Sequence, residues 1–183
     1  PDPALNCHKA GFAAYIQKLS DASGIKIEHA TDVAKALSQR IDYFNECGCK
    51  ASDHGLDYVP FQNYSVEQAD AVYQKGLKGE KLTVEEIEGF QTVILLTLGK
   101  RYAELGIVMQ LHYSCLRNNN NRIFKAQGGD TGVDAIAQNT CGGNISQLLS
   151  ALDEAGCCPK TILYSLNPID NAQLGTLIGC FQD

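Results

Sequence analysis

The sequence predicts an α/β fold in which helices cover a parallel β-sheet. Short apolar runs that end at polar residues alternate along the chain with segments of helical periodicity. This order of strands and helices favours parallel strands joined by right-handed crossovers. The chain has 183 residues, of which 44% are hydrophobic, so it is long enough for one domain with a substantial core.

Two helices and a strand are predicted near the N-terminus. Residues 8–22 carry apolar side chains at the spacing of one helix face. A second helix is expected over 31–45, because Thr31 and the aspartate after it are good helix starters. A short buried strand over 48–52 follows and ends at Asp53, and a loop comes after it.

Two capping boxes mark the starts of the next helices. Ser65 and Gln68 form one such pattern, and Thr83 and Glu86 form the other. In a capping box, two side chains reciprocally bond backbone amides that the helix leaves free. The predicted helices span 66–77 and 84–104. This helical pair is longer than one crossover requires, so we predict that 66–104 is an insertion between two strands.

A polar cluster follows the central predicted strand, 106–112. The strand ends on His112, and Arg117 and four consecutive asparagines come soon after it. Parallel α/β folds place their chemistry at the carboxyl ends of strands, so this cluster is the first candidate site. The alternative is a hydrogen-bonded core histidine before an asparagine-rich turn, and spacing alone favours neither. Residues 113–143 are expected to form a long functional loop.

The C-terminal part continues the alternation of helices and strands. A helix is predicted over 145–155 and a strand over 161–166, and a last helix begins near Asp170 or Asn171. No low-complexity linker or fixed-period repeat divides the chain. We therefore expect residues 1–183 to form a single structural unit.

The composition disfavours two classes of partner. A net charge of −6, without a basic patch, argues against nucleic acid. No apolar stretch approaches the roughly 20 residues that a membrane-spanning helix needs. The first residues also lack the order of a signal peptide. Neither nucleic acid nor a membrane is therefore expected as a partner.

The eight cysteines favour neither disulfides nor a structural zinc site. The chain is too long and too rich in helix patterns for a small disulfide-stapled domain. Cys47 and Cys49, and the adjacent Cys157 and Cys158, lack the spacing of a zinc-binding pair. Several cysteines occupy apolar positions, where a free thiol behaves as a small hydrophobic side chain. We expect reduced, structural cysteines in a cytoplasmic protein.

Several segments, in a fixed order, resemble the uronate isomerase (glucuronate isomerase) family. The most specific one spans 108–124 and includes His112 and Arg117. The others lie on both sides of it, at 1–6, 48–55, 79–83, 129–132, 145–153, 159–168 and 178–182. The resemblance covers nearly the whole chain but only the middle of that family's proteins. It implies an aldose–ketose isomerase that interconverts D-glucuronate and D-fructuronate, and D-galacturonate and D-tagaturonate.

The resemblance also implies a partial (β/α)8 barrel, because uronate isomerases are divergent members of the metal-dependent amidohydrolase superfamily. Such barrels take about 250 residues, so this chain is expected to be a fragment that supplies the central strands. The family's divalent, zinc-like metal is bound by a His-x-His pair and a last-strand aspartate. Both are missing here, as is the family's tryptophan motif. We therefore assign no metal ligand to this chain and expect it to be inactive alone.

Two residues take roles from the resemblance, and two neighbouring residues take roles from their chemistry and position in the sequence. Asp53 and His112 match catalytic residues of the family, and we expect them to bond sugar hydroxyls and relay a proton rather than bind metal. Arg117 is a candidate for binding the substrate carboxylate through its planar guanidinium, or for bracing the asparagine-rich loop, which we rank first. His54 directly follows Asp53 and would point to the opposite side if the strand continued. We therefore expect His54 in the substrate-binding site, but one layer further from the substrate than Asp53, His112 and Arg117.

Two further functions stay open. A complete small enzyme would use Asp53 and His112 without metal, and its activity would survive chelation. A non-catalytic sugar- or protein-binding module derived from the barrel would bind uronate without turnover. If the chain is the expected fragment, the opened barrel exposes strand edges and an apolar inner face, so we expect the chain to self-associate.

Overall fold

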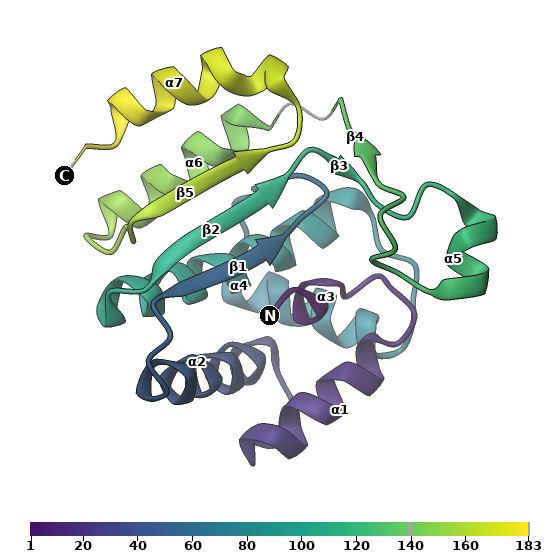
Figure 1. The fold of residues 1–183 in the computed structure, drawn as a ribbon. Coiled ribbons are helices and arrows are strands. Elements are labelled where there is room, and N and C mark those ends of the chain that lie inside the picture. The colour runs from purple at the N-terminus through teal and green to yellow at the C-terminus, as the bar shows by residue number, and fades with distance from the viewer. Residues whose placement is uncertain (139–140, 183) are drawn as a thin grey trace.

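A three-stranded parallel sheet lies at the centre of the computed structural model, which describes residues 1–138 and 141–182 (Figure 1). Its strand order is β1-β2-β5, and helices α4 and α6 lie behind it in the view of Figure 1. The predicted α/β fold with a parallel sheet is confirmed. None of the described helices is long and apolar enough to cross a membrane.

The described elements are η1 (Asp2–Leu5), α1 (Phe12–Ser23), α2 (Ala30–Glu46), β1 (Ala51–Gly55), α3 (Val66–Leu77), α4 (Val84–Leu105), β2 (Val108–Tyr113), β3 (Cys115–Leu116), α5 (Asn121–Gln127), β4 (Ala135–Ile136), α6 (Gly142–Glu154), β5 (Thr161–Ser165), η2 (Pro168–Asp170) and α7 (Asn171–Cys180).

Helices α3 and α4 begin at the two predicted capping boxes. The Ser65 hydroxyl accepts a hydrogen bond from the Gln68 amide at 3.3 Å, and the Thr83 hydroxyl accepts one from the Glu86 amide at 3.2 Å. The Gln68 and Glu86 side chains each bond the amide of the capping residue in return. Helix α4 packs against β2 and α6, and α3 packs against α4. The assignment of 66–104 as an insertion stays a prediction.

Two strands begin later than the sequence indicates. The prediction of a buried strand over 48–52 is wrong, because β1 spans Ala51–Gly55 and only His54 in it is buried. Gly48 has a φ of +92°, a left-handed conformation that strands do not adopt. Strand β2 begins at Val108 because Gly106, with a φ of +65°, is the left-handed cap that ends α4.

The segment between β2 and α6 contains short elements that the sequence reading treated as one loop. Strands β3 and β4 form an antiparallel pair, and α5 lies between them in sequence, at the edge of the fold in Figure 1. Helix α5 begins where Asn120 Oδ1 accepts hydrogen bonds from the amides of Arg122 and Ile123, each at 3.1 Å. Asn139 and Thr140 of the predicted loop lie outside the described residues.

The hydrophobic core fills the space between the sheet and its helices. Phe90 of α4 is fully buried, and its ring centroid lies 6.1 Å from that of Phe12 in α1 and 6.4 Å from that of Tyr73 in α3. Met109 and Leu111 of β2 are buried in the same core. Three thiols are also buried, as expected of small hydrophobic side chains: Cys7, Cys115 and Cys141.

Replacing Gly76 with alanine is expected to lower the free energy of unfolding by about 1–3 kcal/mol. A Cβ atom there would lie 2.7 Å from the backbone carbonyl oxygen of Cys7, so α3 would have to move away from the segment before α1. Chemical denaturation measures the loss. Gly143→Ala is the control, because a Cβ at that position meets nothing within 4 Å. Equal losses in both variants would contradict this explanation.

Candidate functional site

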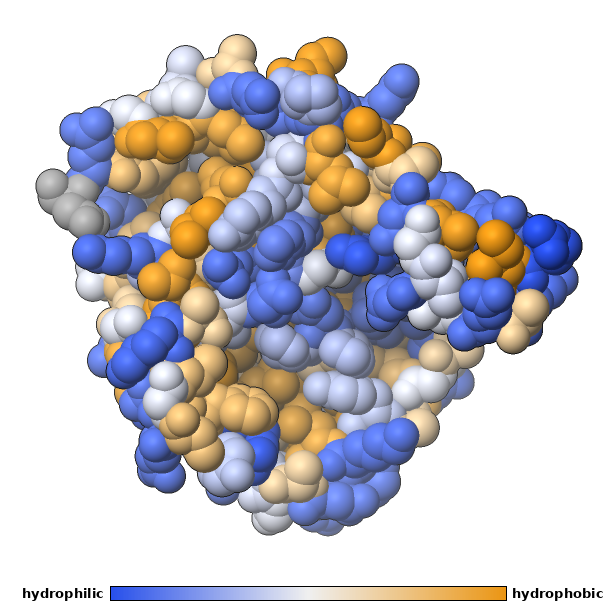
Figure 2. Space-filling view, in the orientation of Figure 1, coloured by the Kyte–Doolittle hydropathy of each residue, from blue (hydrophilic) through white to orange (hydrophobic). Residues whose placement is uncertain are grey.

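The two faces of the sheet differ in character, because side chains alternate between them along each strand. The face toward the helices holds buried side chains such as His54 and Leu111. The other face, called the open face here, carries Asp53 from β1, Gln110 and His112 from β2, and Ile162 and Tyr164 from β5. Figure 2 shows hydrophilic residues in the middle of the molecule in this view, with hydrophobic residues beside them.

Asp53 and His112, the two residues predicted to be catalytic, lie together on the open face. The distance from His112 Nε2 to Asp53 Oδ1 is 2.8 Å. Gly55 is the partner of His112 in the β1–β2 register, so Asp53 lies diagonally across from the imidazole. The two side chains are 36% and 74% exposed, respectively, and both can therefore reach a molecule in front of the sheet.

Tyr164 holds the His112 ring from the other side. It is the partner of His112 in the β2–β5 register, and the two rings stack with centroids 4.3 Å apart and an angle of 1° between their planes. The Tyr164 hydroxyl accepts a hydrogen bond from Gln110 Nε2 at 3.1 Å. The imidazole is therefore restrained by a carboxylate at its edge and by a phenol ring on its face.

This arrangement suits proton transfer on a small hydroxylated molecule. Imidazole is the side chain most often used as a general acid or base, and a neighbouring carboxylate fixes the orientation of its ring. The exposed Asp53 carboxylate can also accept hydrogen bonds from hydroxyl groups of a bound molecule.

His54 lies on the helix-covered face, away from this group. Its side chain is fully buried, with Nδ1 at 2.9 Å from Asp2 Oδ1 and Nε2 at 3.1 Å from the Tyr102 hydroxyl. Both ring nitrogens therefore have protein partners, and the geometry does not support a direct contact between His54 and a substrate. His54 instead joins η1, β1 and α4.

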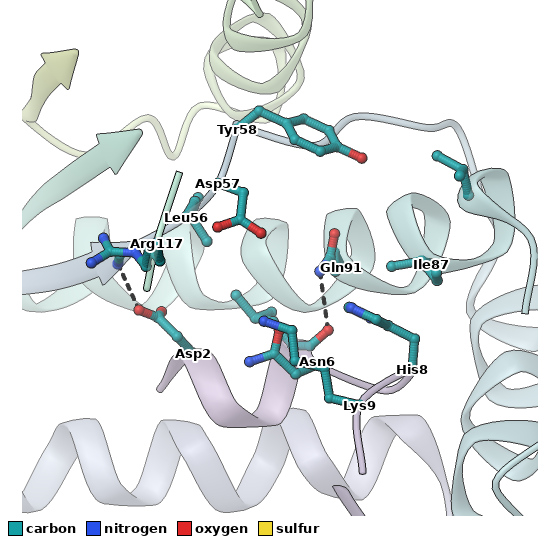
Figure 3. Close-up of a pocket in the computed structure, with 13 residues that line it drawn as sticks. Asp2, Asn6, His8, Lys9, Leu56, Asp57, Tyr58, Ile87, Gln91 and Arg117 are labelled. Carbon is teal, nitrogen blue, oxygen red and sulfur yellow. Dashed lines mark hydrogen bonds between the residues drawn. The ribbon is translucent and has the colours of Figure 1, made fainter. Parts of the chain in front are cut away.

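The Asp2 carboxylate is held in its charged form by the groups around it. Burial alone raises the pKa of Asp2, but the hydrogen bond and charge of His54 and the bond from the Gly55 amide lower this pKa below its ordinary value of 3.8. The Gly55 amide donates to Asp2 Oδ2 at 2.6 Å (Figure 3). Asp2 thereby fastens the start of the described chain to the carboxyl end of β1.

This lowered pKa predicts a loss of stability in acid. An ionised carboxylate whose pKa is lowered by folding stabilises the protein above its unfolded pKa, and the contribution disappears as the pH falls through the folded pKa. As the pH drops below 3.8, the ordinary pKa of Asp2, the free energy of unfolding of the parent chain should therefore decrease. The free energy of unfolding of Asp2→Asn should decrease less steeply over the same pH range. Urea denaturation across acid pH measures both, with the exposed Asp153→Asn as the control. Parallel curves for the parent chain and Asp2→Asn would contradict this role.

Arg117 lies at the carboxyl end of β1 and borders a polar pocket of about 170 Å³ between η1, α4 and the loop after β1 (Figure 3). A Cβ atom on Gly55 would lie 2.9 Å from Arg117 Nη2, so the guanidinium rests on this glycine. Arg117 Nη1 also lies 3.7 Å from Asp134 Oδ2, and Asp134 Oδ1 accepts a hydrogen bond from the Asn118 amide at 2.8 Å. These contacts favour the bracing role over direct substrate binding.

The sequence reading did not single out Tyr164, Gln110 or Asp2. Tyr164 lies in a predicted strand, 161–166, and alternation along that strand could have placed it on one face with Ile162. Its place beside His112 depends on the register of two strands that are far apart in sequence. Asp2 is brought to His54 by the packing of η1, for which the sequence has no local signal.

The described residues do not fit a metal centre by themselves. No three histidine, cysteine, aspartate or glutamate side chains within 1–138 and 141–182 converge closely enough to hold a metal ion. A centre built around Asp53 and His112 would need ligands from other residues. The chemistry argued below therefore uses only side chains of this chain.

Comparisons with known proteins cover the whole chain. A family model described as glucuronate isomerase matches residues 1–183. The chain is 47% identical to a uronate isomerase of Caldanaerobacter subterraneus and 44% identical to one of Salmonella paratyphi B, in both cases over 100% of this chain and 39% of the relative. The crystal structure of uronate isomerase from Thermotoga maritima matches with a TM-score of 0.91 and 30% identity, over 99% of this chain and 40% of that one. The chain thus spans about 39% of the length of these curated relatives.

Proposed function

This chain belongs to the glucuronate isomerase family, and on that premise we propose that it carries part of the active site of a uronate isomerase. The reaction is the interconversion of D-glucuronate and D-fructuronate, with D-galacturonate and D-tagaturonate as a second pair. The likeness to the Thermotoga maritima enzyme confirms the expected partial TIM-type barrel. The open face of the sheet is then part of the inner wall of this barrel.

The contact between His112 and Asp53 is the observation that carries this proposal. Isomerisation moves a proton between C2 and C1 of the sugar through an enediol, and needs a group that accepts and returns this proton. His112 takes this relay role. Asp53, 2.8 Å from its Nε2, orients the imidazole and accepts hydrogen bonds from sugar hydroxyls. Tyr164 limits the movement of the ring from the opposite side.

Arg117 and His54 hold the elements around Asp53 and His112 in place. Arg117 braces the asparagine-rich segment after β2 through Asp134, and its guanidinium faces the carboxyl end of β1. A guanidinium fork also suits the distant carboxylate of a uronate, which is the second role proposed for Arg117. His54 positions β1, and with it Asp53, by tying this strand to η1 and α4.

A divalent, zinc-like metal ion belongs to the proposal for the whole enzyme, with ligands from outside this chain. Bound there, it would stabilise the oxyanion charge that develops at the sugar carbonyl. No step assigned to His112 or Asp53 goes through this ion. We also propose a cytoplasmic location, because the spacing of the cysteines favours reduced thiols.

A chimeric enzyme tests the proposed function. In it, this chain replaces the matching 39% of the Caldanaerobacter subterraneus relative, to which it is 47% identical. The proposal predicts that the chimera converts D-glucuronate to D-fructuronate. A folded chimera that binds D-glucuronate without turnover would contradict the proposal and favour the binding-module alternative.

Self-association is expected of this chain when it is studied alone. Strands β1 and β5 are the outer strands of the described sheet, and Ile162 and Tyr164 on its open face are 42% and 38% exposed. Unpaired strand edges and exposed apolar side chains favour association with another copy. Light scattering should give a mass above that of the single chain, rising with concentration. A constant monomer mass at high concentration would contradict this expectation.

A further inference from the structure

Asp170 is a buried carboxylate at the carboxyl ends of β2 and β5. Its residue surface is only 2% exposed. Its Oδ2 accepts a hydrogen bond from the Ser165 hydroxyl at 2.6 Å and another from the Ser114 hydroxyl at 3.1 Å. One carboxylate oxygen therefore joins two serines that are far apart in sequence.

The two serines flank the stacked rings of the open face. Ser165 directly follows Tyr164 in β5, and Ser114 comes two residues after His112, just beyond β2. The bond from the Leu166 amide to the Tyr113 carbonyl, at 3.1 Å, continues the pairing of these strands up to the carboxylate. Asp170 thus lies where it fixes the relative position of the strands that carry His112 and Tyr164.

Two features indicate that this arrangement is maintained against an energetic cost. Ser114 has a φ of +61°, a left-handed conformation that disfavours residues other than glycine. The Asp170 Oδ1 atom is buried and has no hydrogen-bond partner among the described residues. Burying a carboxylate with incomplete hydrogen bonding is unfavourable. An apolar residue here would leave the Ser114 and Ser165 hydroxyls without this shared acceptor, so the carboxylate is what links the two strand ends.

We propose that Asp170 is a positioning residue for proton transfer by His112. By holding Ser114 and Ser165, it keeps β2 and β5 in the register that stacks Tyr164 on the imidazole. The stack then fixes the ring in the orientation in which it meets the sugar. The inference rests on the proposed function of His112, but the position of the ring is measured independently of turnover.

Nuclear magnetic resonance of the chain detects the stacking of the His112 and Tyr164 rings directly. A ring that lies over the face of a phenol has its carbon-bound protons shifted upfield by the ring current. In Asp170→Ala and Ser165→Ala, the His112 ring protons are expected to move downfield, toward the values of an unstacked imidazole. Asp170→Asn keeps one oxygen for the two hydroxyls and should retain most of the upfield shift. Asp153→Asn, an exposed change on α6, is the control and should leave the shift unchanged.

The same variants in the chimera separate positioning from folding. Displacement of a catalytic group by about 1 Å can lower turnover about 100-fold. Ser165→Ala and Asp170→Ala should therefore lower kcat with little change in KM. Asp170→Asn should retain much of the kcat of the parent chimera. Folded Ser165→Ala or Asp170→Ala proteins with unchanged His112 ring shifts would overturn the positioning role. If Asp170→Ala does not fold, Ser165→Ala decides the question. Failure of this test leaves the isomerase proposal intact, since that proposal fails only if the folded chimera does not convert D-glucuronate.

Discussion

Replacing His112 with asparagine in the chimera is expected to lower kcat about 100- to 10,000-fold, the usual contribution of a general acid–base group. Asparagine keeps a polar side chain but cannot accept and return a proton at a ring nitrogen. The His112 side chain is 36% exposed and outside the helix-covered core, so the melting temperature should change little. Steady-state kinetics with D-glucuronate and thermal unfolding measure both quantities.

His29→Asn is the matched control for this variant. His29 is exposed at the start of α2, and asparagine also caps helices well. Its kinetics should match those of the parent chimera. Turnover by His112→Asn within a few-fold of that parent would remove His112 from the proton relay and leave it a residue that only contacts the sugar.

Replacing Phe90 with alanine is expected to lower the free energy of unfolding by about 3–5 kcal/mol, the range for a buried phenylalanine. Phe90 is fully buried, edge-to-face with Phe12 and stacked with Tyr73, so its ring joins α4 to α1 and α3. The cavity left by truncation borders three helices that cannot all close on it.

Urea denaturation of this chain measures the effect, with Phe124→Ala as the control. Phe124 lies on α5 and is 45% exposed, so its loss should change stability by a much smaller amount. A Phe90→Ala loss no larger than that of Phe124→Ala would mean that the three helices do not depend on this ring.

Local chemistry explains which parts of the fold could be predicted from the sequence. The starts of α3 and α4 agree with the prediction because Ser65 and Thr83 bond amides only three residues away. Strand β1 was misplaced because its residues are mostly exposed, and its strand conformation comes from pairing with β2 rather than from an apolar run. The β3–β4 pair is held by partners across a helix, and each strand is too short for a periodic pattern.

In the candidate site, too, local patterns could be predicted from the sequence, but contacts between distant strands could not. The position of His112 at the end of a predicted strand is enough to predict it as a site residue from the sequence. Its neighbours Asp53 and Tyr164 come from two other strands, and only the register of the sheet brings the three together. Asp170 could not be predicted as a site residue, because a lone aspartate at a helix start has the pattern of an ordinary cap, although it is buried against two serines.

The central claim is that the open face of the sheet, and not the helix-covered face, meets the uronate. Titration of the isotope-labelled chain with D-glucuronate, followed through the ring signals of its histidines and tyrosines, tests this most directly. The claim predicts saturable shifts at His112 and Tyr164 and none at His54, which is enclosed on the opposite face. Shifts centred on His54 or Tyr102, with His112 and Tyr164 unmoved in the folded chain, would contradict it.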